Sequence, residues 1–363
     1  MVALAALFAL VLTGCGGGGD QTDGEPTAGD DTEDPGTTDG DAGEGGDAGP
    51  FTIGVSNGFT GSEWRTQMLA NIEAAFEEYE EQGLVDELII ESADVDVDGQ
   101  IQQIRNLVNA GVDAIIINPN SPDALNAAFD EAAEAGVRIY AIDQAVTAES
   151  VTNVVIDQNE WAKISARWLA EQVGEGGRVV GVNGIAGHPA NEARWSGATE
   201  VLEEAGVEIV TQANANWSQS EGATVMADLL AQYGDDIDGV WAQDGVAEGV
   251  LRALVDADRL DLVTTGEARA GYMRLWQEHD VDTIGVVNPP GVGVTALRIA
   301  MRELQGGQLD ESQLTDGNTI LLPMPDSVTN AELEEWLAEV EDQPDGYSVD
   351  VMLSDDEVAT YFQ

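Results

Sequence analysis

Carboxylate, amide, guanidinium and indole side chains stand where short apolar segments of the sequence end. They are Asn57, Asn118, Asp143, Gln144, Asp244, Glu267 and Asn288 at the segment ends, and Ser62, Trp64, Arg65, Arg194 and Trp217 in the turns and helix starts that follow. Carboxylates and amides bind pairs of hydroxyl groups, an arginine fork binds ring or hydroxyl oxygens, and an indole covers an apolar C–H face. The set therefore favours a pocket for a neutral, polyhydroxylated small molecule.

The apolar segments alternate with stretches that have helical spacing. Val- and Ile-rich segments such as FTIGVS, ELIIES, DAIIIN and VRIYAID are followed by helical patterns at 66–82, 99–110 and 123–135, and a second series begins at VTNVVID. This alternation predicts parallel sheets with helices on both faces. Ligands of such sheets bind beyond the carboxyl ends of the strands, which is where the polar side chains stand.

The chain has 363 residues, which is long enough for two compact lobes. We expect an α/β fold of two doubly wound parallel-sheet lobes joined by a multi-strand hinge. The first lobe would comprise residues 51–156 and 289–320, and the second 157–288 and 321–363. Beyond residue 326 we expect a helix at 330–341, a strand at 347–353 and a short final helix, all wrapping the second lobe.

The amino-terminal 50 residues have two distinct compositions. MVALAALFALVLTGC is an apolar run shorter than a membrane span, and it ends at Cys15, so we interpret residues 1–15 as a signal peptide. The segment Leu12-Thr13-Gly14-Cys15 resembles the lipobox of secreted lipoproteins, which implies lipidation of Cys15; the alternative is a chance cysteine in an apolar leader. Residues 16–50 hold eleven acidic and no basic residues, which predicts a disordered acidic, Gly-rich tether or a processing remnant.

The formal net charge of −56 limits the classes of partner. So negative a chain repels nucleic acid and anionic lipid, so we expect no nucleic-acid partner and membrane contact only through a lipid anchor. The basic residues are twelve arginines and the single Lys163, a balance that resembles the acidic surfaces of halophilic proteins. A merely acidic secreted protein is the alternative.

The sequence gives little support for metal or catalytic chemistry. Asp94, Asp96, Asp98 and Gly99 match the first half of a calcium loop, but Arg105 stands where a bidentate carboxylate is required. We therefore interpret the acidic run as a helix cap. The chain has one cysteine and two histidines, and we expect no metal, no cofactor and no catalytic site. The alternative is a glycosidase, in which two of the carboxylates Asp143, Asp244 and Glu267 would act as acid and base instead of only binding hydroxyls.

Several of these stretches occur together in one known family. From residue 51 to about 326 the chain resembles the sugar-binding lipoproteins and periplasmic proteins of ABC importers, of the ribose- and galactofuranose-binding type. The matching stretches are Val55-Ser56, Trp64-Arg65, GVDAIIINP at 111–119, AID at 141–143, GIAG at 184–187 with Arg194, WAQD at 241–244 and TGE at 265–267. The resemblance implies the periplasmic binding protein type 1 fold, with a ligand held between two closing lobes.

The resemblance also implies roles for individual side chains. Trp64 and Trp217 would sandwich a sugar, with packing in the core as the alternative for both. Asn118 and Asp143 would bind hydroxyls from the first lobe, and Arg194, Asp244, Glu267 and Asn288 from the second; a surface ion pair is the alternative for Arg194. The chain departs from the family pattern at Gln144, Asp244 and Glu267, so a pentose, a hexose, a furanose, a polyol and an amino-bearing ligand all stay open.

The sequence as a whole predicts a substrate-binding lipoprotein outside the cell membrane. It would capture a monosaccharide or polyol as a monomer and deliver it to the permease of an ABC transporter, which works with its ATPase. The alternative is the ligand-binding subunit of a surface sensor or chemoreceptor. A regulator of the lactose-repressor type is disfavoured, because an apolar leader and an acidic segment stand where such a protein carries a helix-turn-helix.

Overall fold

The computed structural model describes residues 49–324 and 326–363. The predicted signal peptide, Cys15 and the tether up to residue 48 lie outside these residues. Within the described part of the chain, no helix is both long and apolar enough to cross a membrane.

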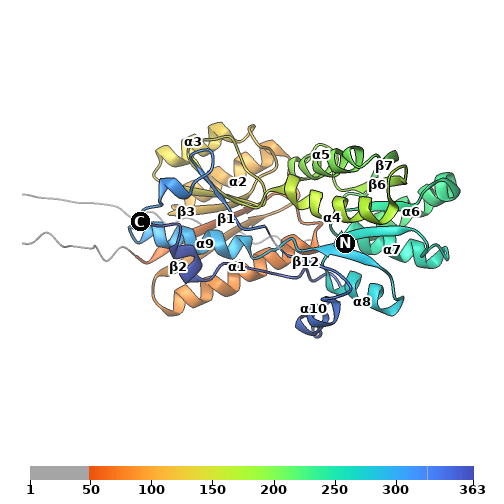
Figure 1. Ribbon diagram of the computed structural model, residues 1–363. Helices are drawn as coiled ribbons and strands as arrows, with labels where there is room; N and C mark the ends of the chain where they lie inside the picture. Colours follow the sequence, from red (N-terminus) through yellow and green to blue (C-terminus); the bar gives the residue numbers. More distant parts are fainter. Residues whose placement is uncertain (1–48, 325) are drawn as a thin grey trace, which may run out of the picture. The chain divides into compact units, whose positions relative to one another are not determined.

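The first lobe is built on a six-stranded parallel sheet with the order β11-β5-β4-β3-β1-β2. Its strands are β1 (Phe51–Asn57), β2 (Val85–Ser92), β3 (Ala114–Asn118), β4 (Arg138–Ile142), β5 (Val151–Val155) and β11 (Thr319–Leu321). The helices are α1 (Glu63–Glu81), α2 (Val97–Ala110), α3 (Asn126–Glu134) and α9 (Val292–Leu304). Ala114 and Ile116 of β3 pack with α1 and α9, whereas Ile115 and Ile117 pack with α2 and α3, as two-sided burial of a parallel strand requires. Figure 1 shows these helices around the sheet.

The second lobe repeats this plan with the strand order β12-β10-β9-β8-β6-β7. Its strands are β6 (Arg178–Asn183), β7 (Glu208–Asn214), β8 (Gly239–Ala242), β9 (Val263–Glu267), β10 (Thr283–Val286) and β12 (Ser327–Val328), of which only β12 runs antiparallel. Helices α4 (Gln158–Val173) and α5 (Pro189–Glu204) cover one face. Helices α6 (Gln219–Tyr233), α7 (Val246–Asp256) and α8 (Ala270–Glu278) cover the other. The prediction of two α/β lobes with mostly parallel sheets is confirmed.

Local sequence signals set the helix ends. The Asp96 side chain accepts a hydrogen bond from the Gly99 N–H and caps α2, so the interpretation of the acidic run as a helix cap is confirmed. Asp157 caps α4 in the same way, accepting from the N–H groups of Asn159 and Glu160. This cap starts α4 immediately after β5 and so fixes where the chain enters the second lobe.

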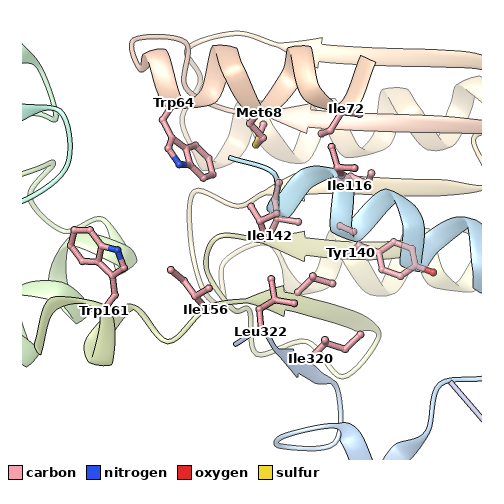
Figure 2. Close-up of a cluster of buried hydrophobic side chains, with 14 of the residues drawn as sticks. Trp64, Met68, Ile72, Ile116, Tyr140, Ile142, Ile156, Trp161, Ile320 and Leu322 are labelled. Atoms are coloured by element: carbon pink, nitrogen blue, oxygen red, sulfur yellow. The ribbon is translucent and has the colours of Figure 1, made fainter. Parts of the chain in front are cut away.

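The chain passes between the sheets after β5, after β10 and after β11. The largest hydrophobic cluster follows these passages, since it includes Ile142 and Ile320 of the first sheet, Ile156 and Leu322 of the passages, and Trp161 of α4 (Figure 2). The lobes therefore share a continuous apolar core at their junction.

The last part of the chain differs from expectation. The predicted helix at 330–341 is the shorter α10 (Leu333–Glu339), which packs on α8 of the second lobe. The predicted strand at 347–353 does not form, because its backbone meets another strand-like segment only at the isolated bridge between Ser348 and Arg269. The final helix α11 (Asp355–Ala359) packs on α9 of the first lobe, so the second lobe that we propose ends before α11.

Candidate functional site

A small cavity of about 20 Å³ lies between the two lobes, at the carboxyl ends of their strands. It is lined by Ser62, Trp64, Arg65, Asp143, Ala190, Arg194, Trp217, Asp244 and Asn288. All of these except Ala190 are predicted site residues. A water molecule needs roughly 10–15 Å³ of such space, so a larger ligand requires the lining to move apart.

Three of the lining residues have left-handed backbone conformations. The φ angles are 68° at Asp143, 54° at Trp217 and 57° at Asp244, although none of these residues is glycine. Such conformations are disfavoured for side chains with a Cβ, and they gather at binding and catalytic sites, where the surrounding structure holds them. These three positions therefore lie at the carboxyl ends of the strands, where the sequence predicts the binding residues.

Arg65 is buried and is held by two amide oxygens of the first lobe. Its Nη1 donates to Asn57 Oδ1 at 2.9 Å, and its Nη2 donates to Asn118 Oδ1 at 3.0 Å. Burial lowers the pKa of Arg65 to about 10, against the attraction of Asp143 and Asp244, so the guanidinium stays charged at neutral pH. Asn57 and Asn118 do not line the cavity; they fix the cation that does.

Arg194 lies on the second lobe and joins the carboxylates of both lobes. Its Nε donates to Gln158 Oε1 at 2.7 Å, and Gln158 Nε2 donates to Asp143 Oδ1 at 3.0 Å. Its Nη1 donates to Asp244 Oδ2 at 3.3 Å, and its guanidinium stacks 4.4 Å from the Trp161 ring centre. The side chain is 2% exposed, so the surface ion-pair alternative for Arg194 is wrong.

Arg269 neutralises two buried carboxylates behind the cavity. Its Nη2 donates to Asp244 Oδ1 at 2.5 Å and its Nε donates to Glu267 Oε1 at 2.9 Å. Burial raises the pKa of Asp244, but Arg269 and Arg194 outweigh it, so the pKa lies below its usual range. Burial raises the pKa of Glu267, because that side chain has no exposed surface. Glu267 does not line the cavity; it accepts from Asn288 Nδ2 at 3.4 Å.

The two predicted sandwich indoles have different surroundings. Trp64 lines the cavity and also packs in the hydrophobic core, with 4% of its surface exposed, so the core alternative and the site alternative are not exclusive. Trp217 is half-buried, and its Nε1 donates to Gln243 Oε1 at 3.3 Å. A Cβ at position 184 would overlap this indole, so Gly184 makes its approach possible.

Gln144 lies next to the cavity without lining it. Its Nε2 donates to the Pro119 carbonyl and to Asn118 Oδ1, and lies 3.5 Å from His188 Nε2 of the second lobe. The His188 ring meets Trp217 edge to face, with ring centres 4.7 Å apart. Gln144 therefore contacts the opposite lobe through a histidine.

Four of these side chains were missed from the sequence: Gln158, Trp161, His188 and Arg269. Gln158 follows β5 by three residues, after Ile156 and the capping Asp157, so a search of the residues beyond each strand would have found it. Arg269 follows β9 by two residues, but its pairing with Glu267 and Asp244 carries no sequence pattern. His188 and Trp161 stand on helix starts, and only the fold brings them to the site.

Comparison with known proteins gives one family for most of the described chain. The family model described as "Periplasmic binding protein domain" matches residues 53–308. The ribose import binding protein of Bacillus subtilis is 26% identical over 264 residues, which is 72% of this chain and 84% of that protein. The xylitol-binding protein of Mycolicibacterium smegmatis is 31% identical over 183 residues, which is 50% of this chain and only 52% of that protein.

Solved structures show the same fold. A solute binding protein of an ABC transporter from Thermobispora bispora has a TM-score of 0.77 at 23% identity, covering 86% of this chain and 94% of that chain. A galactofuranose binding protein has a TM-score of 0.70 at 22% identity, covering 82% of this chain and 100% of that chain. At these identities the likeness shows that the chain shares the fold of these proteins.

Proposed function

The chain belongs to the periplasmic binding protein family, and from that premise we propose that it captures a monosaccharide or polyol between its lobes and delivers it to an ABC transporter permease. The observation that carries the proposal is the cavity lining, in which both lobes contribute guanidinium, carboxylate and indole groups. The family places such proteins outside the cytoplasm and gives them a binding function in transport.

The charges of the lining support a neutral ligand. Arg65 and Arg194 face Asp143 and Asp244, so cations and anions balance within the lining. Carboxylate oxygens accept from hydroxyls, guanidinium groups donate to hydroxyl and ring oxygens, and Trp64 and Trp217 offer apolar faces. The relatives named for ribose, xylitol and D-apiose support the same ligand class.

The site suggests how ligand binding changes the lobes. Asp143 belongs to the first lobe, whereas Arg194 and Asp244 belong to the second. A ligand that contacts all three gains most of its contacts when the lobes are together, and it shifts the population towards the closed form. Only this form presents both lobes in one arrangement to a permease.

The proposal includes attachment to the outer face of the cell membrane. Cys15 would carry the lipid, and residues 16–50 would act as the tether; the apolar leader and the acidic composition support this. We further propose a monomer with a salt-adapted acidic surface, supported by the net charge of −56.

A thermal-shift screen tests the proposed ligand class. The chain without residues 1–15 is heated in molar salt with pentoses, hexoses, polyols, amino sugars and nucleosides. One sugar or polyol at a hundredfold over its dissociation constant should add about 2.7 kcal/mol to the free energy of unfolding and raise the melting temperature by a few degrees. A shift with a nucleoside alone would contradict the ligand class.

A further inference from the structure

The segment 340–354, here called the C-terminal segment, is bound to the second lobe at its start. Arg274 Nη2 donates to the carbonyls of Val340 and Gln343, each at 2.8 Å, and Arg274 Nη1 donates to Asp345 Oδ1 at 2.8 Å. Further along, the Val349 N–H donates to the Ala268 carbonyl at 2.8 Å. The segment is therefore fixed to the loop and helix that follow β9.

The other end of the C-terminal segment is bound to the first lobe. Arg298 Nη1 of α9 donates to the Leu353 carbonyl at 2.5 Å, and the Leu353 N–H donates to Thr295 Oγ1 at 3.2 Å. The segment continues into α11, which packs on α9. The chain thus crosses between the lobes once more after the passages at β5, β10 and β11.

A side chain of α1 meets this crossing at Ser348. The Ser348 N–H donates to Gln67 Oε1 at 2.9 Å, and Gln67 Nε2 donates to the Ser348 carbonyl at 3.0 Å. Ser348 is held to the second lobe by its bridge to Arg269, whereas Gln67 belongs to the first lobe. Hydrogen bonds are lost beyond about 3.5 Å, so this pair cannot survive separation of the lobes.

The same serine touches the candidate site. Ser348 has no exposed surface, and its Oγ donates to Glu267 Oε1 at 2.8 Å. Glu267 also accepts from Arg269 and Asn288. Gln67 is one helical turn beyond Trp64 on α1. The Gln67–Ser348 contact therefore connects residues next to the cavity lining of the first lobe with residues next to the lining of the second.

We propose that the C-terminal segment is an interlobe clasp, in which the Gln67–Ser348 pair forms when the lobes close and breaks when they open. The clasp ends there, because Asp350 is bound to the first lobe by the Asn71 side chain and by the Gly291 N–H, which donates to its Oδ1 at 2.6 Å. The clasp goes beyond the proposed function and depends on it only for the closure of the lobes. It sets the balance of open and closed forms in the protein without ligand.

Distance measurement between the lobes tests the clasp. Glu134→Cys on α3 and Glu204→Cys on α5 place labels on exposed positions of the two lobes, in the chain without residues 1–15. The distribution of label distances is measured without any sugar. Gln67→Ala should lower the ratio of closed to open molecules about tenfold, which corresponds to about 1.4 kcal/mol.

Gln82→Ala is the matched control, because Gln82 ends the same helix and bonds only within it, to the Glu78 carbonyl at 2.9 Å. Its distribution should match the wild type. Equal distributions for the wild type, Gln67→Ala and Gln82→Ala overturn the clasp. If Gln67→Ala does not fold, Gln67→Glu replaces it. The glutamate side chain still accepts from the Ser348 N–H but cannot donate to the Ser348 carbonyl. A shift to the open form smaller than tenfold then supports the clasp, and no shift overturns it. Because no ligand is added, the result is independent of the ligand screen.

Discussion

Trp64 and Trp161 donate their indole N–H groups to two consecutive carbonyls, those of Asn288 at 2.8 Å and Val287 at 2.9 Å. Trp64 comes from α1 of the first lobe and Trp161 from α4 of the second, and both carbonyls belong to the passage between β10 and α9. In Figure 2 the two indoles lie at one side of the side chains that are drawn, and the apolar cluster continues from Trp161 into the second lobe. One indole from each lobe therefore fixes the backbone of the same passage.

The first prediction concerns these indole bonds. Trp161→Phe keeps an aromatic ring but removes the donor, leaving the buried Val287 carbonyl unpaired, which should cost about 1–3 kcal/mol. Urea unfolding measures the change. Trp168→Phe on the same helix is the control, since no indole bond of Trp168 is found among the described residues, and equal losses in both variants would contradict the role of the bond.

The second prediction concerns the buried charges behind the cavity. Among the described residues, Asp244 pairs with Arg194 and Arg269, and Glu267 pairs with Arg269. Arg269→Met removes the Arg269 pairs, at a cost of about 3–5 kcal/mol. Adding Glu267→Gln should recover part of this loss. Arg105→Met, which removes an exposed pair with Glu131, should change stability little. A small loss for Arg269→Met would show that water reaches the two carboxylates.

The third prediction concerns ligand affinity. Trp217→Ala removes a half-buried indole from the cavity lining and should weaken binding of the ligand found in the screen by one to three orders of magnitude, or about 1–4 kcal/mol. Titration calorimetry measures the affinity. Trp336→Ala, on α10 away from the cavity, is the control. An unchanged affinity in Trp217→Ala would leave this indole a packing role only.

The fourth prediction concerns salt. The chain carries 69 acidic against 13 basic residues, so the folded state contains many carboxylates that repel one another. Salt screens this repulsion over about 10 Å at 0.1 M and about 3 Å at 1 M. The melting temperature should therefore rise from millimolar to molar sodium chloride, whereas a flat profile would argue for an ordinary acidic secreted protein.

Much of the site could be predicted from the residues at strand ends, because a parallel sheet brings the carboxyl ends of its strands to one edge. Asp143 and Asp244 follow β4 and β8, and the carboxyl ends of these strands meet between the lobes. The sequence could not distinguish side chains that line the cavity from side chains that form hydrogen bonds to the lining residues. Asn57, Asn118 and Glu267 end strands and Gln144 follows one by two residues, but all four bond to lining or neighbouring groups.

The C-terminal segment was the part of the fold that the sequence described least well. YSVDVML alternates apolar and polar residues as a strand does, but the structure buries the adjacent Ser348 and Val349 and exposes Val351, so burial does not follow the alternation. Its crossing depends on Arg274, Arg298 and Gln67, which are 55 or more residues away along the chain from the groups in the segment that they bond. Local periodicity does not report contacts of this range.

The fifth prediction concerns the pH dependence of stability. Burial, with repulsion from Arg65 and Arg194, lowers the pKa of His188 to about 3, against a smaller attraction from Asp244. The unfolded chain protonates its histidines near pH 6.5, so it binds more protons than the folded protein between about pH 3 and 6.5. The contribution of His188 to the free energy of unfolding is therefore complete above pH 6.5 and is lost on acidification, by at most about 1.4 kcal/mol per pH unit.

His188→Gln isolates this contribution, because glutamine has no proton to gain and can still contact Gln144 and Trp217. Urea midpoints at pH 7 and pH 5 should show that the variant loses up to about 2 kcal/mol less than the wild type over this interval. His279→Gln, the change at the other histidine, which follows α8 in the second lobe, is the matched control and should follow the wild type. If His188→Gln and the wild type lose the same stability between pH 7 and pH 5, then His188 takes up a proton in the folded protein. In that case the contact between His188 and Trp217 must open to water well above pH 3.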